Sequence, residues 1–152
     1  MTHKELDRKV QELWNSAPIK WAFGIAQEKA MLKEWGLEDT KESWNNITYI
    51  GNGGYVLDKD MPRVKEISAQ AKKMTYEFYD NNPEELAKKA IYEFNNYECS
   101  LTHNPNDPLD AIPCTMNEKN KEIIRKQWKK YCRKNSFDYY DPFTIPNLRI
   151  NM

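Results

Sequence analysis

The feature that most constrains the fold is a pair of short β-prone segments joined by a glycine-rich turn. Residues 47–50 (ITYI) and 55–57 (YVL) flank residues 51–54 (GNGG), so β-branched and aromatic side chains surround positions that can adopt positive φ. This pattern predicts a β-hairpin. A phosphate-binding loop is the alternative, but no helix opens directly after the glycines and no Lys-Ser/Thr pair follows them.

The other strong patterns in the chain have the three-to-four-residue period of a helix. They predict helices over residues 2–15, 26–35, 60–81, 83–97 and 118–134, with one further turn before Trp44. The last helix follows a capping-box spacing from Thr115 to Glu118. A short buried strand is predicted at residues 21–23 (WAF). Because the link near Pro83 is so short, the two helices beside it are expected to pack antiparallel.

Together these patterns predict an α+β fold, a mostly helical single domain with a small antiparallel hairpin or sheet. A chain of 152 residues suits one domain with a real core. We expect a compact domain over residues 1–134. Residues 135–152 are expected to form an irregular aromatic tail that packs on the domain or on a partner.

Charge and hydropathy exclude several classes of protein. Lys+Arg and Asp+Glu are both 23, so no global field draws the chain to nucleic acid or an anionic membrane. No apolar run could span a bilayer and the N-terminus is charged, which predicts a cytoplasmic protein without a membrane partner. Three widely spaced cysteines fit neither a disulfide framework nor a zinc site, so reduced thiols are expected.

A polar segment between two helical patterns is the first candidate ligand site. It contributes Glu93, Asn96, Glu98, His103, Asp107 and Asp110. Oxygen-rich groups of this kind suit Mg²⁺, Mn²⁺ or Ca²⁺. The same residues equally serve turns and helix starts, so no metal or cofactor is predicted. Nucleophilic catalysis has little support, because no base is identified beside Cys99.

The last predicted helix is the best candidate for recognition of a partner. The residues expected to contact a partner are Arg125, Lys126, Lys129, Lys130, Arg133, Tyr139 and Tyr140. Such a helix could meet phosphates or an acidic protein. The alternative is an ordinary solvated face opposite the buried stripe of Ile124, Trp128 and Tyr131.

The order of several short motifs resembles a known family. The motifs are residues 21–23, the IGNGGY run of residues 50–55, Glu93-x-x-Asn96-x-Glu98 and Asp107-x-x-Asp110-Ala111. This order is similar to a family of uncharacterised small proteins carried by phages and conjugative elements of gut anaerobes. The chain differs from that pattern at Asn96, where histidine is expected. The resemblance implies an accessory protein of a mobile element, a class that acts mainly by binding.

We therefore expect stoichiometric binding of a host protein, as an inhibitor of a host defence system, through the basic helix and the tail. One alternative is a nucleotide sponge, in which Trp21 and Tyr55 stack on a base beside Gly53 and Gly54. Another is a metal-dependent enzyme that uses the acidic residues between Glu93 and Asp110. Nucleic acid and a second copy of the chain remain alternative partners.

Overall fold

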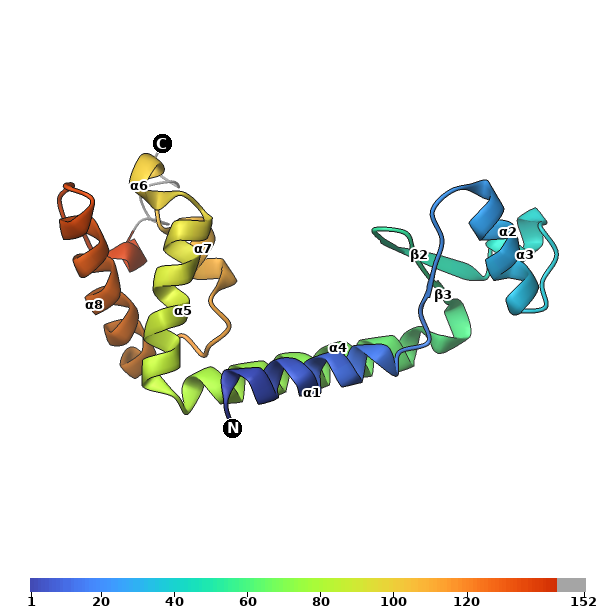
Figure 1. The fold of residues 1–152 in the computed structure, drawn as a ribbon, viewed down its shortest axis with the longest axis horizontal. Coiled ribbons are helices and arrows are strands. Elements are labelled where there is room, and N and C mark those ends of the chain that lie inside the picture. The colour runs from blue at the N-terminus through green and yellow to red at the C-terminus, as the bar shows by residue number, and fades with distance from the viewer. Residues whose placement is uncertain (145–152) are drawn as a thin grey trace. The chain divides into compact units, whose positions relative to one another are not determined.

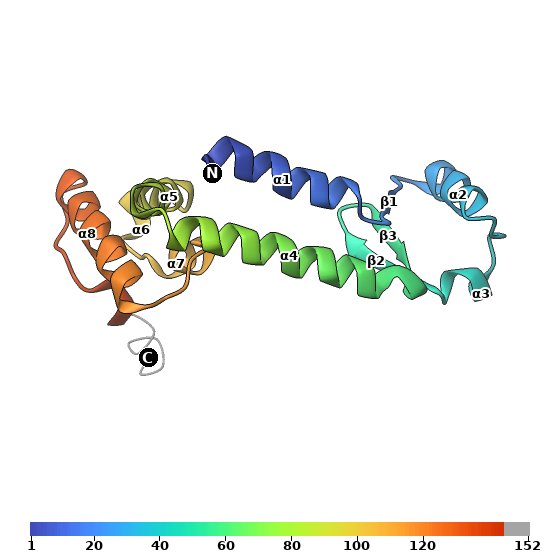
Figure 2. The same ribbon diagram turned by 90° about the horizontal axis from the view of Figure 1, so that it is seen from below.

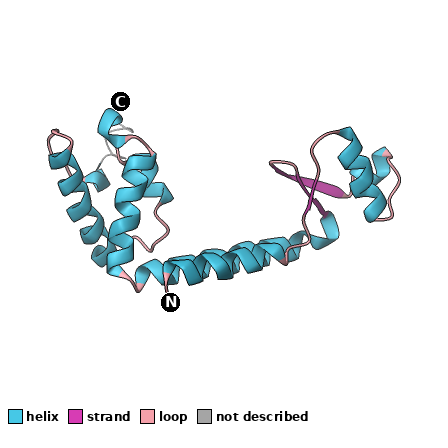
Figure 3. Cartoon of the chain, in the orientation of Figure 1, coloured by secondary structure: helices cyan, strands magenta, loops and turns pink. Residues whose placement is uncertain are grey.

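The computed structural model describes residues 1–144 and confirms a mostly helical α+β protein with one small sheet (Figure 3). Residues 145–152 of the predicted tail lie outside the described part. In chain order the elements are α1 (His3–Asn15), β1 (Lys20–Trp21), α2 (Ile25–Glu34), α3 (Lys41–Trp44), β2 (Ile47–Gly51), β3 (Gly54–Leu57), the 3-10 turn η1 (Asp58–Asp60), α4 (Met61–Asp80), α5 (Pro83–Asn96), α6 (Cys99–Thr102), α7 (Asn106–Ala111), α8 (Glu118–Lys134) and the 3-10 turn η2 (Pro142–Thr144).

Two compact units make up the chain. The sheet unit comprises residues 7–71, and the helical unit comprises residues 1–6 and those from 72 onward. All three strands therefore belong to the sheet unit, and α5 to α8 belong to the helical unit. Within residues 1–144, every helix is too short or too polar to cross a bilayer.

The predicted hairpin is present and is extended by a third strand. The strands are antiparallel in the order β1-β3-β2. Asn52 and Gly53 connect β2 to β3 with φ of 51° and 82°. Positive φ at both turn residues matches the right-handed twist of the two strands. The register shifts between Tyr49 and Gly51, where Ile50 is the extra residue of a bulge.

The prediction of a buried strand at residues 21–23 was wrong. β1 has only two residues, and Trp21 and Phe23 are 57% and 65% exposed, whereas Ala22 between them is buried. The hydrophobicity of the segment suggested burial on both faces. Only the face that carries Ala22 meets the core, because side chains alternate along extended backbone.

The helical unit is organised around the contact between α5 and α8, which lie side by side in Figure 1. Phe94 of α5 and Trp128 of α8 are fully buried, and their ring centroids are 4.9 Å apart. Tyr131 stacks on Trp128 at 5.8 Å. The predicted α8 stripe of Ile124, Trp128 and Tyr131 is thus confirmed as core.

Two predictions about helix ends and packing were wrong. α5 packs mainly against α8 and α7 and not antiparallel on α4 (Figure 2). The N-cap of α8 is Asn117, whose side chain accepts from the Asn120 backbone N–H at 2.9 Å. Thr115 instead bonds to Asp80 at the end of α4, a long-range partner that the local spacing does not reveal.

Candidate partner-binding surface on α8

One face of α8 carries a row of exposed cations, which we call the basic stripe. It comprises Lys119, Lys126, Lys129, Lys130 and Arg133. The spacings of three, four and seven residues place these side chains on one side of the helix. The buried residues of α8 occupy the opposite side. Four of the seven residues predicted to contact a partner therefore lie together on one exposed surface.

The basic stripe is unpaired within the part of the chain that the structure describes. Among residues 1–144, the cations of α8 that form ion pairs are Lys121 and Arg125. No carboxylate there lies within ion-pair distance of a member of the stripe. The stripe is therefore a cationic surface whose charges are available to a partner.

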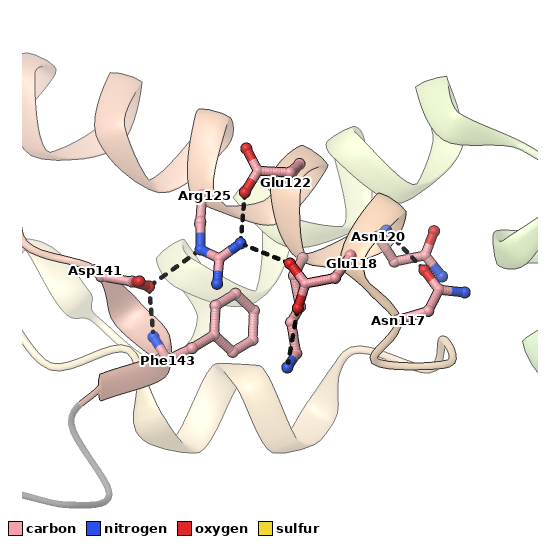
Figure 4. A network of polar contacts seen from close by, with 8 residues as sticks. Asn117, Glu118, Asn120, Glu122, Arg125, Asp141 and Phe143 are labelled. Atoms are coloured by element: carbon pink, nitrogen blue, oxygen red, sulfur yellow. Dashed lines mark hydrogen bonds and ion pairs between the residues drawn. The ribbon is translucent and has the colours of Figure 1, made fainter.

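Arg125 has an internal role instead (Figure 4). Its guanidinium lies 2.5 Å from Glu122 and 3.5 Å from Glu118, and its Nε donates to Asp141 at 3.2 Å. Its hydrogen bonds to Glu122 and Asp141 raise the pKa of Arg125 above its ordinary value. The ring of Phe143 lies 5.1 Å from the guanidinium. Arg125 therefore anchors the segment after α8 rather than offering a free charge.

Of the two tyrosines in the predicted set, one has an internal role and the other is exposed. Tyr140 donates its hydroxyl hydrogen to the His103 carbonyl and meets Trp128 edge-on, with centroids 5.9 Å apart. Tyr139 is 42% exposed, and the Lys129 ammonium lies 5.7 Å from its ring. Burial raises the pKa of both tyrosines above the ordinary value. Tyr140 holds the chain in place, and Tyr139 adds an aromatic edge to the basic stripe.

An open pocket of about 500 Å³ lies where the stripe meets this aromatic edge. Its lining residues are Glu122, Ile123, Arg125, Lys126, Lys129 and Tyr139. The two lysines and the tyrosine place cationic and aromatic groups around one concavity. Such a concavity could receive an acidic side chain of a partner.

The residues predicted to bind a ligand fall into different units. Trp21, Gly53, Gly54 and Tyr55 belong to the sheet unit. Trp21 pairs with Gly54, and a Cβ at Gly54 would be 2.9 Å from the Trp21 ring. Tyr55 donates its hydroxyl hydrogen to Glu28 at 3.1 Å, and burial and this carboxylate raise the pKa of Tyr55.

The other predicted ligand residues lie in the helical unit, mostly in local structure. Glu93 is 5% exposed and pairs with Lys89 at 2.8 Å, while Asn96 donates to it at 3.4 Å. Glu98 and His103 have left-handed backbone at the two ends of α6. Asp107 lies in the first turn of α7, and Asp110 lies further along the same helix.

His103 is further occupied by the segment after α8, since its ring stacks on Phe137 at 4.0 Å. Among residues 1–144, no three His, Cys, Asp or Glu side chains gather closely enough to hold a metal ion.

The three cysteines form no disulfide with one another, and all three are buried. Burial raises the pKa of each thiol to about 11. Since the thiolate is the nucleophilic form, these thiols are almost entirely unreactive in the folded chain at neutral pH.

Sequence reasoning missed several exposed apolar side chains on the sheet unit. Phe23, Tyr49 and Ile50 are 65%, 58% and 39% exposed. A signal was available in residues 21–23, where a small residue separates two large aromatic residues. That alternation indicates one buried face and one exposed aromatic face.

Comparison with known proteins gives a family but no activity. No curated protein and no solved structure matches the chain significantly. A family model described as "Family of unknown function (DUF7659)" matches residues 2–134. This match covers both units and ends with α8. The chain therefore belongs to the DUF7659 family.

Proposed function

We propose that this protein acts by stoichiometric binding to a partner protein with an acidic surface, which meets the basic stripe and Tyr139. The observation that carries this proposal is the absence of an internal ion pair, within residues 1–144, for any of the five cations of the stripe. A carboxylate brought by a partner gains a Coulomb interaction without breaking an existing pair. The stripe also lies opposite the core face of α8, so binding does not require that α8 unpack.

The segment after α8 supports the same surface. Asp141 is held by Arg125, and the Asp141 carboxylate also accepts from the Phe143 backbone N–H at 3.0 Å. Tyr139 lies in the chain between two further fixed points, the Phe137 ring stacked on His103 and the Tyr140 hydroxyl bond. An exposed aromatic residue that is already ordered contributes contact area at low entropic cost.

An acidic protein fits this surface better than nucleic acid does. The carboxylates of Glu118 and Glu122 lie beside the basic stripe and would repel a row of phosphates. The chain as a whole carries equal numbers of acidic and basic residues, so it has no long-range attraction for a polyanion. A folded partner can place its acids at the cations and avoid the two glutamates.

In the genetic setting that the family resemblance implies, the partner would be a host protein. The protein would act as a mobile-element accessory factor that occludes its target, with a component of a host defence system as the proposed target. Occlusion requires one protein per target and no turnover, which agrees with a binding surface built from side-chain charge.

The test is capture from a host lysate with three versions of the protein. Wild type is compared with K126A/K129A/K130A and with a control, K65A/K72A/K73A, that removes three exposed lysines from α4. We expect one protein to be captured in fixed ratio by wild type and the control, and to be lost with the α8 variant. Native mass spectrometry of the eluted complex gives the ratio. Equal capture by all three versions would refute the proposal.

The ligand hypotheses are separated by a fourth version. D107N/D110N should leave capture unchanged, because both residues lie on α7, away from the basic stripe along the chain. A nucleotide or metal found as excess mass on wild type and lost from this variant would favour a small-ligand role.

A further inference from the structure

Trp21, Phe23 and Ile50 lie against the glycines of the hairpin, and each of these side chains is exposed. Trp21 and Ile50 meet above Gly54, since both side chains lie 2.9 Å from the position of a Cβ on that glycine. Phe23 covers Gly53 in the same way, at 2.4 Å. Because both glycines lack side chains, the two rings and Ile50 lie directly on the backbone and leave a wide apolar surface open to water.

β2 borders this surface and is an edge strand. The order β1-β3-β2 leaves one side of β2 without a strand neighbour. In an antiparallel strand, about half of the N–H and C=O groups point to each side, so β2 presents a row of them outward. Edge strands are usually protected by lysine, proline or charge, and residues 47–51 (ITYIG) contain none of these. A bulge at Ile50 is the protection present, and it lies at the turn end of the strand.

We propose that β2 pairs antiparallel with β2 of a second copy of this chain, which joins two three-stranded sheets across a two-fold axis. The strand is suited to pairing with itself because it carries no charge, so no like charges meet across the axis. In the register centred on Tyr49, the two Tyr49 side chains face each other and Thr48 faces Ile50. Aromatic and β-branched pairs of this kind stabilise antiparallel strands.

The side chains of β2 agree with this occupant. Tyr49 and Ile50 are exposed and uncharged. A charged partner would gain little from them, whereas an identical uncharged strand meets them without repulsion. A two-fold contact uses the same patch on both subunits, so one exposed edge strand satisfies both partners.

The first measurement uses the unmodified protein. Amide hydrogen exchange is followed at low micromolar and at several hundred micromolar protein. We expect residues 47–50 to exchange at least tenfold more slowly at the higher concentration, with α8 unchanged. Exchange at residues 47–50 that is independent of concentration would refute the pairing.

The second measurement uses a matched pair of variants in sedimentation equilibrium. Y49K places two ammonium groups face to face at the axis, while Y92K makes the same change at a tyrosine of α5 with nearly equal exposure, 59% against 58%. Y49K should raise the dimer dissociation constant at least tenfold, and Y92K should leave it unchanged. I50K gives a second substitution in β2, and circular dichroism checks that each variant is folded.

Two sedimentation results would overturn the proposal. One is a wild-type protein that stays monomeric at every concentration. The other is a dimer that Y49K and I50K weaken no more than Y92K does, which would locate the contact elsewhere. Slow exchange of residues 47–50 seen only after addition of another protein would also overturn self-pairing, because the occupant of the edge would then be a different chain.

Discussion

Asp80 joins the end of α4 to the segment before α8, and its removal should destabilise the helical unit. Its Oδ1 accepts from the Thr115 backbone N–H and from Asn120 Nδ2, both at 2.8 Å. Its Oδ2 accepts from the Thr115 hydroxyl at 2.6 Å. Asn120 is 1% exposed, and its other bond from Nδ2 goes to the Thr115 carbonyl at 2.7 Å. The carboxylate thus holds two residues more than 30 positions away.

The loss of stability depends on which hydrogen-bond partners of Asp80 can bond to water once the carboxylate is removed. A hydrogen bond to a charged group contributes about 1.5 to 3 kcal/mol. Thr115 is exposed, so water can replace Asp80 there. Asn120 is buried, and Asp80→Ala leaves part of its amide without a partner. We expect Asp80→Ala to lower the free energy of unfolding by about 3 kcal/mol, and Tm by roughly 6 to 12 °C.

Asp80→Asn separates hydrogen bonding from charge. An asparagine keeps the Oδ1 that accepts from Thr115 and Asn120. Its amide group can donate to the Thr115 hydroxyl, which can accept as well as donate. We expect a loss of about 1 kcal/mol for this variant. Asp110→Ala, which removes an exposed carboxylate in the same unit, should change stability by less than about 0.5 kcal/mol.

Labelling of the cysteines measures the unfolding of the helical unit by itself. Cys99, Cys114 and Cys132 all lie in this unit and are buried, so a thiol reagent reacts with them only after the unit opens. The extent of labelling against urea concentration gives the free energy of unfolding for each variant. A loss below about 1 kcal/mol for Asp80→Ala, or equal losses for the alanine and asparagine variants, would refute the reasoning.

Four further outcomes are expected. Trp128→Ala should cost about 4 kcal/mol in urea unfolding, and Trp128→Phe under about 2, because the buried indole N–H makes no hydrogen bond within residues 1–144. The free energy of unfolding measured by cysteine labelling should be constant below pH 9 and fall as pH rises towards 11, since the folded-state pKa of the three cysteines is raised from 9.0 to about 11. Replacing one of these cysteines by alanine should reduce the slope of that fall with pH. Arg125→Met should free Asp141 and speed amide exchange in residues 137–144 at least tenfold, with exchange in α5 as the control. Gly53→Ala should cost about 1 kcal/mol in thermal unfolding, because φ there is +82° and the added methyl group displaces the Phe23 ring; unchanged stability would contradict that account.

Much of the secondary structure could be predicted because its signals are local. The hairpin follows from residues 47–57, whose turn needs positive φ at Asn52 and Gly53. The α8 stripe follows from the helical period alone. The further turn expected before Trp44 is α3, which begins after Thr40, because the Thr40 side chain accepts from the Ser43 N–H at 3.2 Å.

The candidate site was predicted only in part, and Arg125 shows why. On α8 it follows the same spacing as its basic neighbours, so sequence reasoning grouped it with Lys126 and Lys129. In the structure it is bound by Glu122 and by Asp141, which lies 16 residues along the chain. Whether a side chain is free to bind another protein depends on such distant contacts, and the helical period of the sequence does not reveal them.

The sequence by itself indicated the longer helices, the hairpin, and the apolar and basic faces of α8. Those properties depend on neighbours within a few residues, and the chain pattern contains them. Only the tertiary structure decided that α5 packs on α8, that Asp80 caps a distant segment and that Trp21 and Phe23 are exposed. Periodicity identifies the faces of an element, but what covers each face depends on contacts between residues far apart in the chain.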